Sequence, residues 1–336
     1  MMGADRLDRL RTPVSSRTDW LLFVLLGFFW GSSYIFIKIG VDAGLTPFTL
    51  VSIRLLFGLA ILGGVVAIAR EQLPRDPRMY AHLAVLGAFS VAIPFTLITW
   101  AERSVDSTIA ATITSAVPLF VIGIAAFALR DEPITPNRLV GVAVGLFGVA
   151  LLVGFDPAAL SQGSLAAEIA LVGATASYAL GGVYARRMVH GLRPMIPALF
   201  QVAFAFVYVT VLAFIFERPL EAPMTTETLF AVAWLGILGS GLAYLIFFRL
   251  LGRWGATRTS MVAYLLPVFG LVLGAAVLEE AVDARLIVGT ALVIGGIAVV
   301  NSRFGSRPLH GRHDQVPDSR DTTGANASAS RSVTTK

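Results

Sequence analysis

The sequence has no cysteine, almost no lysine and little charge of either sign. Without cysteine, disulfides, thiolate catalysis and Cys-based metal sites are excluded. The four histidines show no metal-ligand spacing inside an apolar segment, so no metal and no other cofactor is predicted. Only Lys38 and Lys336 are lysines, and charged residues make up 14% of the chain, against about a quarter in soluble domains. The missing charge indicates that much of the chain lies in a solvent other than water.

Long apolar runs take the place of the missing charge. Hydrophobic residues make up 56% of the 336 residues, and the mean hydropathy is +0.77. A helix needs about 20 apolar residues to cross a hydrocarbon core of roughly 30 Å. The chain is therefore predicted to be an all-α polytopic membrane protein with ten transmembrane helices. They are expected at Trp20–Ile39, Thr46–Ala69, Tyr80–Trp100, Ser107–Leu129, Asn137–Val153, Ser164–Arg186, Pro194–Phe216, Thr228–Leu251, Ala256–Leu278 and Arg285–Ser302.

The distribution of arginine predicts the orientation, because positively charged loops stay in the cytoplasm. The segment 1–19 and every second loop after it are rich in arginine, whereas the loops between them hold one arginine or none. The protein is therefore expected in the inner membrane of a bacterial cell, with both termini in the cytoplasm. The tail 303–336 is expected to be disordered. The net charge of +5 forms no basic face, which argues against nucleic acid and favours membrane lipid as a partner.

The two halves of the chain, 20–153 and 164–302, correspond to each other with a shift of about 148 residues. Each half would contain five helices, and an odd number turns the second half upside down relative to the first. Inverted repeats are typical of secondary transporters, because exchanging the conformations of the two repeats moves the opening to the other side of the membrane. The corresponding pairs include Trp30 and Tyr178, Lys38 and Arg186, Arg54 and Gln201, Pro118 and Pro267, and Glu132 and Glu280.

Short motifs recur along both halves. The first half contains Phe29-Trp30-Gly31-Ser32-Ser33, then Lys38, Pro47 and Arg54. The second contains Gly239-Ser240-Gly241-Leu242-Ala243-Tyr244, Trp254-Gly255-Ala256-Thr257, Leu266-Pro267-Val268, and Leu278-Glu279-Glu280 followed by Gly289. From Trp20 to Val300 the chain resembles the EamA-type repeats of the drug/metabolite transporter superfamily.

That resemblance implies ten helices, a central cavity between the halves, and export of amino acids, other metabolites or drugs. The small four-helix relatives in this superfamily couple protons to cationic drugs through a glutamate in their first helix. The run Trp20–Ile39 contains no acidic residue, so this chain departs from that pattern.

Ionisable and aromatic residues inside the apolar runs are the candidates for a substrate site. Trp30, Tyr34 and Lys38 follow one another at intervals of four and share one face of the first helix, where rings and an ammonium suit a substrate with an anionic group. Arg54 lies about 10 Å into the second helix, at a depth where a charge costs about 2.5 kcal/mol or more. The alternatives are a snorkelling Lys38 at the interface and an Arg54 that bonds backbone carbonyls.

Neutral candidates complete the predicted site. They are Trp100, Tyr178, Gln201, Tyr244 and Tyr264, of which Trp100 equally suits a headgroup anchor. Hinges are predicted at Pro118, Pro267, Gly239 and Gly241, with a static kink as the alternative at the prolines. Since no acidic residue matches Lys38 and Arg54 at comparable depth in their own helices, the substrate is expected to carry an anionic group, as an amino acid does.

The glycines of the fifth and tenth runs form small-residue faces for tight helix packing, either within the monomer or in a homodimer.

The apolar runs offer no nucleophile–base pair or carboxylate dyad, so an enzyme is not expected. A secondary transporter that exports small metabolites is the function predicted. A multidrug exporter of the same fold and a non-transporting membrane sensor or lipid-handling protein remain the alternatives.

Overall fold

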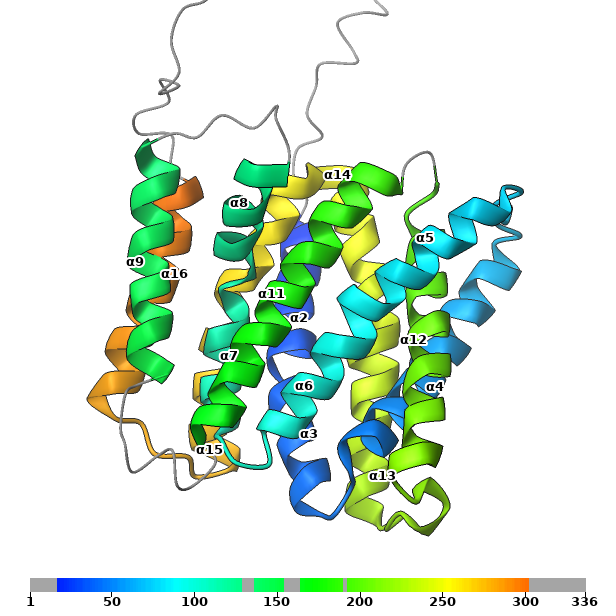
Figure 1. Cartoon of the computed structure of the whole chain (residues 1–336), viewed down its shortest axis with the longest axis horizontal. Helices are drawn as coiled ribbons and strands as arrows, with labels where there is room; N and C mark the ends of the chain where they lie inside the picture. Colours follow the sequence, from blue (N-terminus) through cyan, green and yellow to red (C-terminus); the bar gives the residue numbers. More distant parts are fainter. Residues whose placement is uncertain (1–16, 129–135, 154–163, 190–191, 302–336) are drawn as a thin grey trace, which may run out of the picture.

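The computed structural model describes residues 17–128, 136–153, 164–189 and 192–301. Within these ranges the chain is built of helices and contains no strand. Figure 1 shows the helices running side by side along one direction as a single bundle. The two terminal tails, the loop 154–163 and Glu132 lie outside the described residues, so the predictions that concern them stay predictions.

The helices of the first half begin with a span that turns at Ser32. Prolines open several of these helices, in the first turn, where the missing N–H costs no hydrogen bond. The elements are α2 (Arg17–Gly31), α3 (Ser33–Asp42), α4 (Pro47–Ile68), α5 (Pro77–Gly87), η2 (Ala88–Ala92), α6 (Ile93–Ala101), α7 (Ser107–Ser115), α8 (Val117–Ala128) and α9 (Pro136–Val153).

The second half repeats much of this order. Its elements are α11 (Ser164–Met188), α12 (Met195–Phe216), η3 (Pro219–Glu221), α13 (Thr226–Ala233), η4 (Trp234–Leu242), α14 (Ala243–Ser260), η5 (Met261–Tyr264), α15 (Leu265–Val277) and α16 (Ala284–Asn301).

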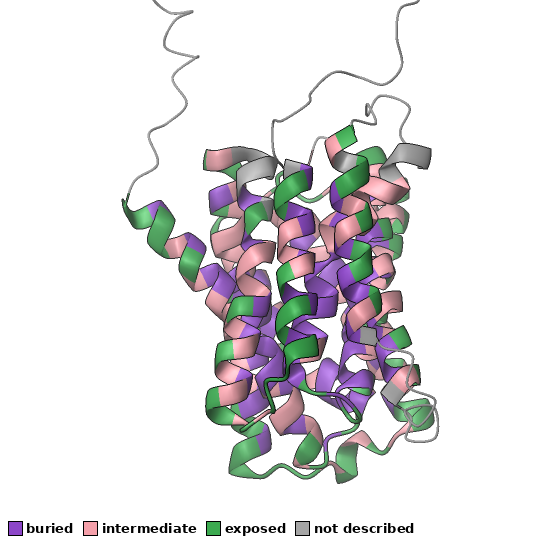
Figure 2. Cartoon of the chain, turned by 90° about the vertical axis from the view of Figure 1, so that its left-hand side faces the viewer, coloured by how far each residue is buried: buried purple, intermediate pink, exposed green. Residues whose placement is uncertain are grey.

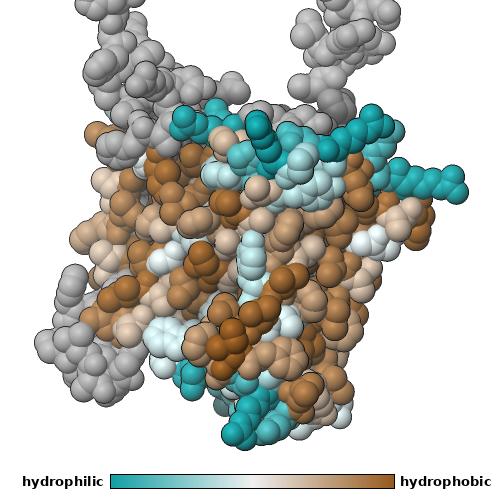
Figure 3. Space-filling model, turned by 45° about the vertical axis from the view of Figure 1, so that its right-hand side comes forward, coloured by the Kyte–Doolittle hydropathy of each residue, from teal (hydrophilic) through white to brown (hydrophobic). Residues whose placement is uncertain are grey.

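The described helices have the length and composition of membrane spans. Seven are long and apolar enough to cross a bilayer, and three shorter apolar helices lie at Leu139–Leu152, Met261–Val277 and Ala284–Val300. Figure 3 shows a broad apolar band with hydrophilic side chains gathered at the two ends of the molecule. Figure 2 shows that exposed residues line the outer faces of the helices while buried residues face inward. This pattern identifies a polytopic helical membrane protein.

The run Ser107–Leu129 begins at Ser107 as predicted and turns at Ala116, between α7 and α8, within one candidate span. One predicted boundary is wrong. The loop expected at 252–255 does not exist, since α14 continues to Ser260. Glycine weakens a helix but does not end it, and no proline follows Gly252 before Pro267 to do so.

Each half contains a π-helical segment at the corresponding place. The segment η2 joins α5 to α6, and η4 joins α13 to α14. The carbonyl of Phe89 in η2 accepts a hydrogen bond from the Ser177 hydroxyl at 2.7 Å. The carbonyl of Gly239 in η4 accepts one from the Trp30 indole at 3.3 Å. Since a π-helix displaces carbonyls from the α-helical pattern, a side chain of the other half satisfies one of them in each case.

The helices α9 and α16 pack against each other at one edge of the bundle (Figure 1). Their glycines allow the two backbones to touch, and a Cβ added to Gly296 would lie 2.6 Å from the carbonyl oxygen of Gly141. Similarly, a Cβ on Gly148 would lie 2.9 Å from the carbonyl oxygen of Gly289. Of the two packing partners predicted for these glycine faces, the structure shows the one within the chain.

Candidate functional site

The Arg54 side chain lies at the centre of the candidate site. It projects from α4 and is buried, with 4% of its surface exposed. Its Nη2 donates to the hydroxyl of Ser240 in η4 at 3.3 Å, and its guanidinium carbon lies 4.2 Å from the centroid of the Phe95 ring. Its Nε has no hydrogen-bond partner among the described residues. A buried guanidinium with an unused donor is suited to bind an anion.

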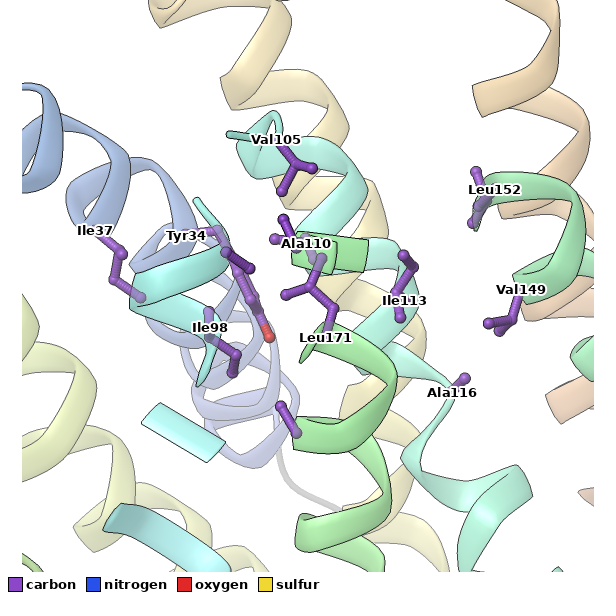
Figure 4. Packing of buried hydrophobic residues seen from close by; sticks show 14 of the residues in the cluster. Tyr34, Ile37, Ile98, Val105, Ala110, Ile113, Ala116, Val149, Leu152 and Leu171 are labelled. Carbon is purple, nitrogen blue, oxygen red and sulfur yellow. The ribbon is translucent and has the colours of Figure 1, made fainter. Parts of the chain in front are cut away.

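Aromatic side chains from both halves surround Arg54. Tyr34, Tyr178 and Tyr244 are close enough to interact with it electrostatically. The Tyr34 hydroxyl shares a hydrogen bond of 2.6 Å with that of Thr114, and Figure 4 shows its ring among buried apolar side chains. The ring of Tyr178 lies edge-on to that of Phe95, with 6.4 Å between the centroids. The structure therefore brings together three of the predicted tyrosines around the predicted arginine.

Two indole N–H groups tie the first span to η4. Besides Trp30, which bonds the carbonyl of Gly239, Trp234 donates to the hydroxyl of Ser32 at 3.1 Å. The ring of Trp30 also lies edge-on to that of Tyr244, at 6.2 Å. Trp30 thus belongs to the group around Arg54, and its contacts join α2 to the π-helical segment.

Lys38 is paired with an acid of its own helix. Its ammonium lies 3.4 Å from the carboxylate of Asp42, four residues on in the same helix, and donates to the main-chain carbonyl of Glu102 at 2.9 Å. Lys38 thus has an acidic partner in its own helix, although Asp42 is exposed at the end of α3 and does not match Lys38 in depth. Asp42 looked like a loop residue because it stands at the end of the apolar run. Of the two predicted cations, Lys38 and Arg54, only Arg54 has no ion pair with a described acidic side chain.

Three other predicted residues lie apart from these contacts. Trp100 is 40% exposed on the surface of α6. Gln201 is buried on α12, where its main chain approaches Gly87 of α5. Tyr264 ends η5 and packs against the buried apolar cluster that includes Ala110 and Ile113. Within the described residues, no hydrogen bond or ring contact joins Trp100 or Gln201 to Arg54.

The predicted hinge residues fall at breaks or close approaches. Pro118 follows the interruption between α7 and α8, and Pro267 follows η5 at the start of α15. Gly239 and Gly241 belong to η4, where side chains of α4 come close. A Cβ on Gly241 would lie 3.0 Å from Ile61, and one on Gly239 would lie 2.9 Å from the Ser33 hydroxyl. The glycines thus allow α4 and the first span to pack on η4.

Several site residues were not predicted. Phe95, Thr114 and Ser240 resemble ordinary residues of an apolar helix, and only their place beside Arg54 or Tyr34 distinguishes them. Glu102 is fully buried just after α6, although its place at the end of a run suggests a loop. The described residues hold no group of three or more His, Cys, Asp or Glu side chains suited to a metal ion. What the site offers is one cation, several rings and hydroxyls.

These observations describe a helical membrane protein in which basic and aromatic side chains of both halves form a candidate site. The family model described as "EamA-like transporter family" matches the chain twice, at residues 19–154 and 165–302. The chain belongs to this family. Its members are transporters and not enzymes, so the protein is a multi-pass membrane transporter of small molecules.

Curated relatives agree with the family. The chain is 23% identical over 280 residues to "Uncharacterized transporter YoaV" of Bacillus subtilis, covering 83% of this chain and 95% of that one. It is 28% identical over 247 residues to "Uncharacterized inner membrane transporter YedA" of Escherichia coli, covering 73% and 78%. It is 24% identical over 298 residues to the "Probable amino-acid metabolite efflux pump" of Escherichia coli, covering 84% and 95%.

A solved structure described only as "Crystal structure of protein" has the same fold. It superposes with a TM-score of 0.61 at 22% identity, covering 85% of this chain and 98% of that one. At this identity the likeness concerns the arrangement of helices alone.

Proposed function

We propose that the protein exports small metabolites that carry an anionic group, such as amino acids, by alternating access to a site around Arg54. The account includes ten crossings in two inverted five-helix repeats and cytoplasmic termini in an inner membrane. The main support for this proposal is the Arg54 guanidinium. It is buried and forms no ion pair with a described acidic side chain.

Burial of an unpaired charge is expensive, because the surroundings replace only part of its hydration. Around Arg54 the lost hydration is partly replaced by the Ser240 hydroxyl and the face of the Phe95 ring. Neither carries a full negative charge. A substrate carboxylate at the free Nε would supply that charge and a charge-assisted hydrogen bond. The candidate site is therefore suited to an anionic group and poorly suited to a bare cation.

The rings beside Arg54 extend the site toward the rest of a substrate. Trp30 and Tyr244 are partly exposed and lie edge-on to each other, and Tyr178 is partly exposed beside Phe95. Such rings offer apolar contact to a side chain and a negative face to an ammonium. An amino acid combines these features with a carboxylate. The Escherichia coli relative named as an amino-acid metabolite efflux pump supports the same class of substrate.

Matched irregularities in the two halves support alternating access. The π-helical segments η2 and η4 correspond, and so do the interruptions before Pro118 and Pro267. Helix movements in transporters are absorbed where the regular hydrogen-bond pattern is already broken. Exchange of conformations between the halves requires such places in both.

A homodimer through α9 and α16 would use the outward faces of these helices and not their glycine faces. Because the glycines of both helices already contact one another within the chain, a partner would have to pack on their outward side chains. These include Phe147 and Val140 on α9 and Ile287 on α16, all exposed.

The test of the substrate class is counterflow into liposomes that contain the purified protein. Vesicles are loaded with one common L-amino acid at a time, or with its amide, which has the same side chain and ammonium but no carboxylate. We expect exchange of labelled amino acid with the loaded amino acid and at most weak exchange with the amide. Exchange driven by a cationic drug but not by any amino acid would favour a multidrug exporter. Absence of exchange with every compound would favour a sensor.

A further inference from the structure

Glu102 is a buried acid whose carboxylate has no partner. It directly follows the span Pro77–Ala101 and is completely buried. Neither of its carboxylate oxygens has a hydrogen-bond partner among the described residues. Its main-chain carbonyl, in contrast, accepts the hydrogen bond from the Lys38 ammonium at 2.9 Å. The Lys38 ammonium therefore bonds the backbone of this residue, while the carboxyl group has no hydrogen-bond partner among the described residues.

Charged groups from three other parts of the chain face Glu102. They are Lys38 and Asp42 on α3, Arg54 on α4, and Glu280 after α15, and the Tyr34 hydroxyl also interacts with it. The helix α11 packs on α6 as well, but its Tyr178 faces Phe95 and no described charged group of α11 acts on Glu102.

The neighbouring acids have partners that Glu102 does not have. Glu280 accepts hydrogen bonds from the main-chain N–H groups of Ser107 and Thr108 at the start of α7, at 2.7 and 3.0 Å, and from the Thr108 hydroxyl. Asp42 is paired with Lys38. Both acids therefore have hydrogen-bond or ion-pair partners, and the negative charge of Glu280 adds to the cost of ionising Glu102.

The electrostatics of this arrangement favour a neutral Glu102. Burial raises the pKa of Glu102 well above its ordinary value, and Glu280 raises the pKa further, while Lys38 and Arg54 lower it. Opening this end of the bundle to water would remove the largest of these effects. It would also allow the flexible Lys38 side chain to move from Asp42 to the Glu102 carboxylate.

We infer that Glu102 is a proton-binding site: its carboxyl carries a proton while this end of the bundle is closed around it and releases the proton to water when that end opens. The inference rests on the alternating access proposed above. Because closure and protonation favour each other, transport responds to a proton gradient. Glu102 also acts electrostatically on Arg54, which links the proton site to the substrate site.

The first test measures the proton itself and needs no substrate. Infrared spectra of the purified protein at neutral pH should contain the carbonyl stretch of a protonated carboxylic acid. That band should be lost or weakened in Glu102→Gln, which mimics the neutral acid in shape. It should be unchanged in Glu221→Gln, since Glu221 is exposed and paired with Arg218. An identical band in the wild type and in Glu102→Gln would overturn the inference.

The second test measures coupling in proteoliposomes with a labelled mixture of the common L-amino acids. The quantity compared is the accumulation with a pH gradient divided by that without one. We expect a several-fold ratio for the wild type and for Glu221→Gln, and a ratio near one for Glu102→Gln. A wild-type ratio in Glu102→Gln would contradict the coupling role. Absence of counterflow in the wild type would instead overturn the proposed function, and the infrared band would still decide the proton site.

Discussion

The guanidinium carbon of Arg54 lies 4.2 Å from the centroid of the Phe95 ring. This contact joins α4 to α6 and holds the cation of the candidate site against an aromatic face. Cation–π contacts contribute about 0.5–2 kcal/mol, more when they are desolvated. The ring therefore lowers the cost of burying Arg54.

Replacing Phe95 with leucine should weaken transport without abolishing it. Loss of about 1 kcal/mol of cation–π interaction corresponds to an approximately fivefold increase in KM. Phe95→Tyr keeps the aromatic face and should stay within about twofold of the wild type. Initial rates of counterflow over a range of substrate concentrations measure both variants. Equal KM values for Phe95→Leu and the wild type would show that the ring does not position Arg54.

The packing of α9 on α16 can be tested with two adjacent glycines. A Cβ on Gly296 would clash with the carbonyl oxygen of Gly141, whereas one on Gly295 would meet nothing within 4 Å. Overpacking of this kind costs about 1–3 kcal/mol, so Gly296→Ala should lower the thermal unfolding midpoint in detergent. Gly295→Ala is the matched control and should leave the midpoint unchanged or slightly higher. Equal midpoints for the two variants would refute the close approach.

The raised pKa of Glu102 predicts how stability depends on pH. The folded protein holds this proton at pH values where the unfolded chain, with an ordinary glutamate, has released it. The contribution of Glu102 to stability is therefore greatest below the ordinary pKa and falls as the pH rises toward the raised value. The unfolding midpoint of the wild type should decline over this range more steeply than that of Glu102→Gln. Parallel curves would contradict the prediction.

Cysteine labelling tests the orientation, and the natural absence of cysteine makes single reporters simple. A cysteine at Thr225, before α13, should react with an impermeant maleimide added outside intact cells. One at Arg75, before α5, should react only after the membrane is opened. The reverse pattern at both positions would show that the membrane orientation is inverted.

The sequence predicts the helices well because apolar length and proline carry most of the information. The helix α4 begins at Pro47, one residue after the expected start, whereas α5 begins at Pro77, three residues before the expected Tyr80, since proline is tolerated in a first turn. The π-helical segments escape prediction, because an apolar run offers no pattern that separates an i→i+5 turn from an α-helix. The continuous α14 was missed because Gly252 suggests a loop unless the packing around it is known.

The site was predictable only in part. Charge inside an apolar run marks Arg54, and helical spacing places Trp30 and Tyr34 on one face of the first span, because both signals are local in the sequence. The pairing of Lys38 with Asp42 requires α3 to continue past the apolar run to Asp42, and the burial of Glu102 depends on how distant segments enclose the end of α6. A residue that follows an apolar run resembles a loop residue until those segments are placed.

The counterflow activity of Arg54→Gln tests the central claim most directly. Gln keeps hydrogen-bonding capacity but removes the positive charge, so exchange of an amino acid should fall at least about tenfold while the unfolding midpoint changes little. The preference for the amino acid over its amide should disappear in the same variant. Arg218→Gln removes an exposed arginine and serves as the control, with wild-type exchange expected. Undiminished exchange and an intact preference in Arg54→Gln would contradict the assignment of Arg54 to the anionic group of the substrate.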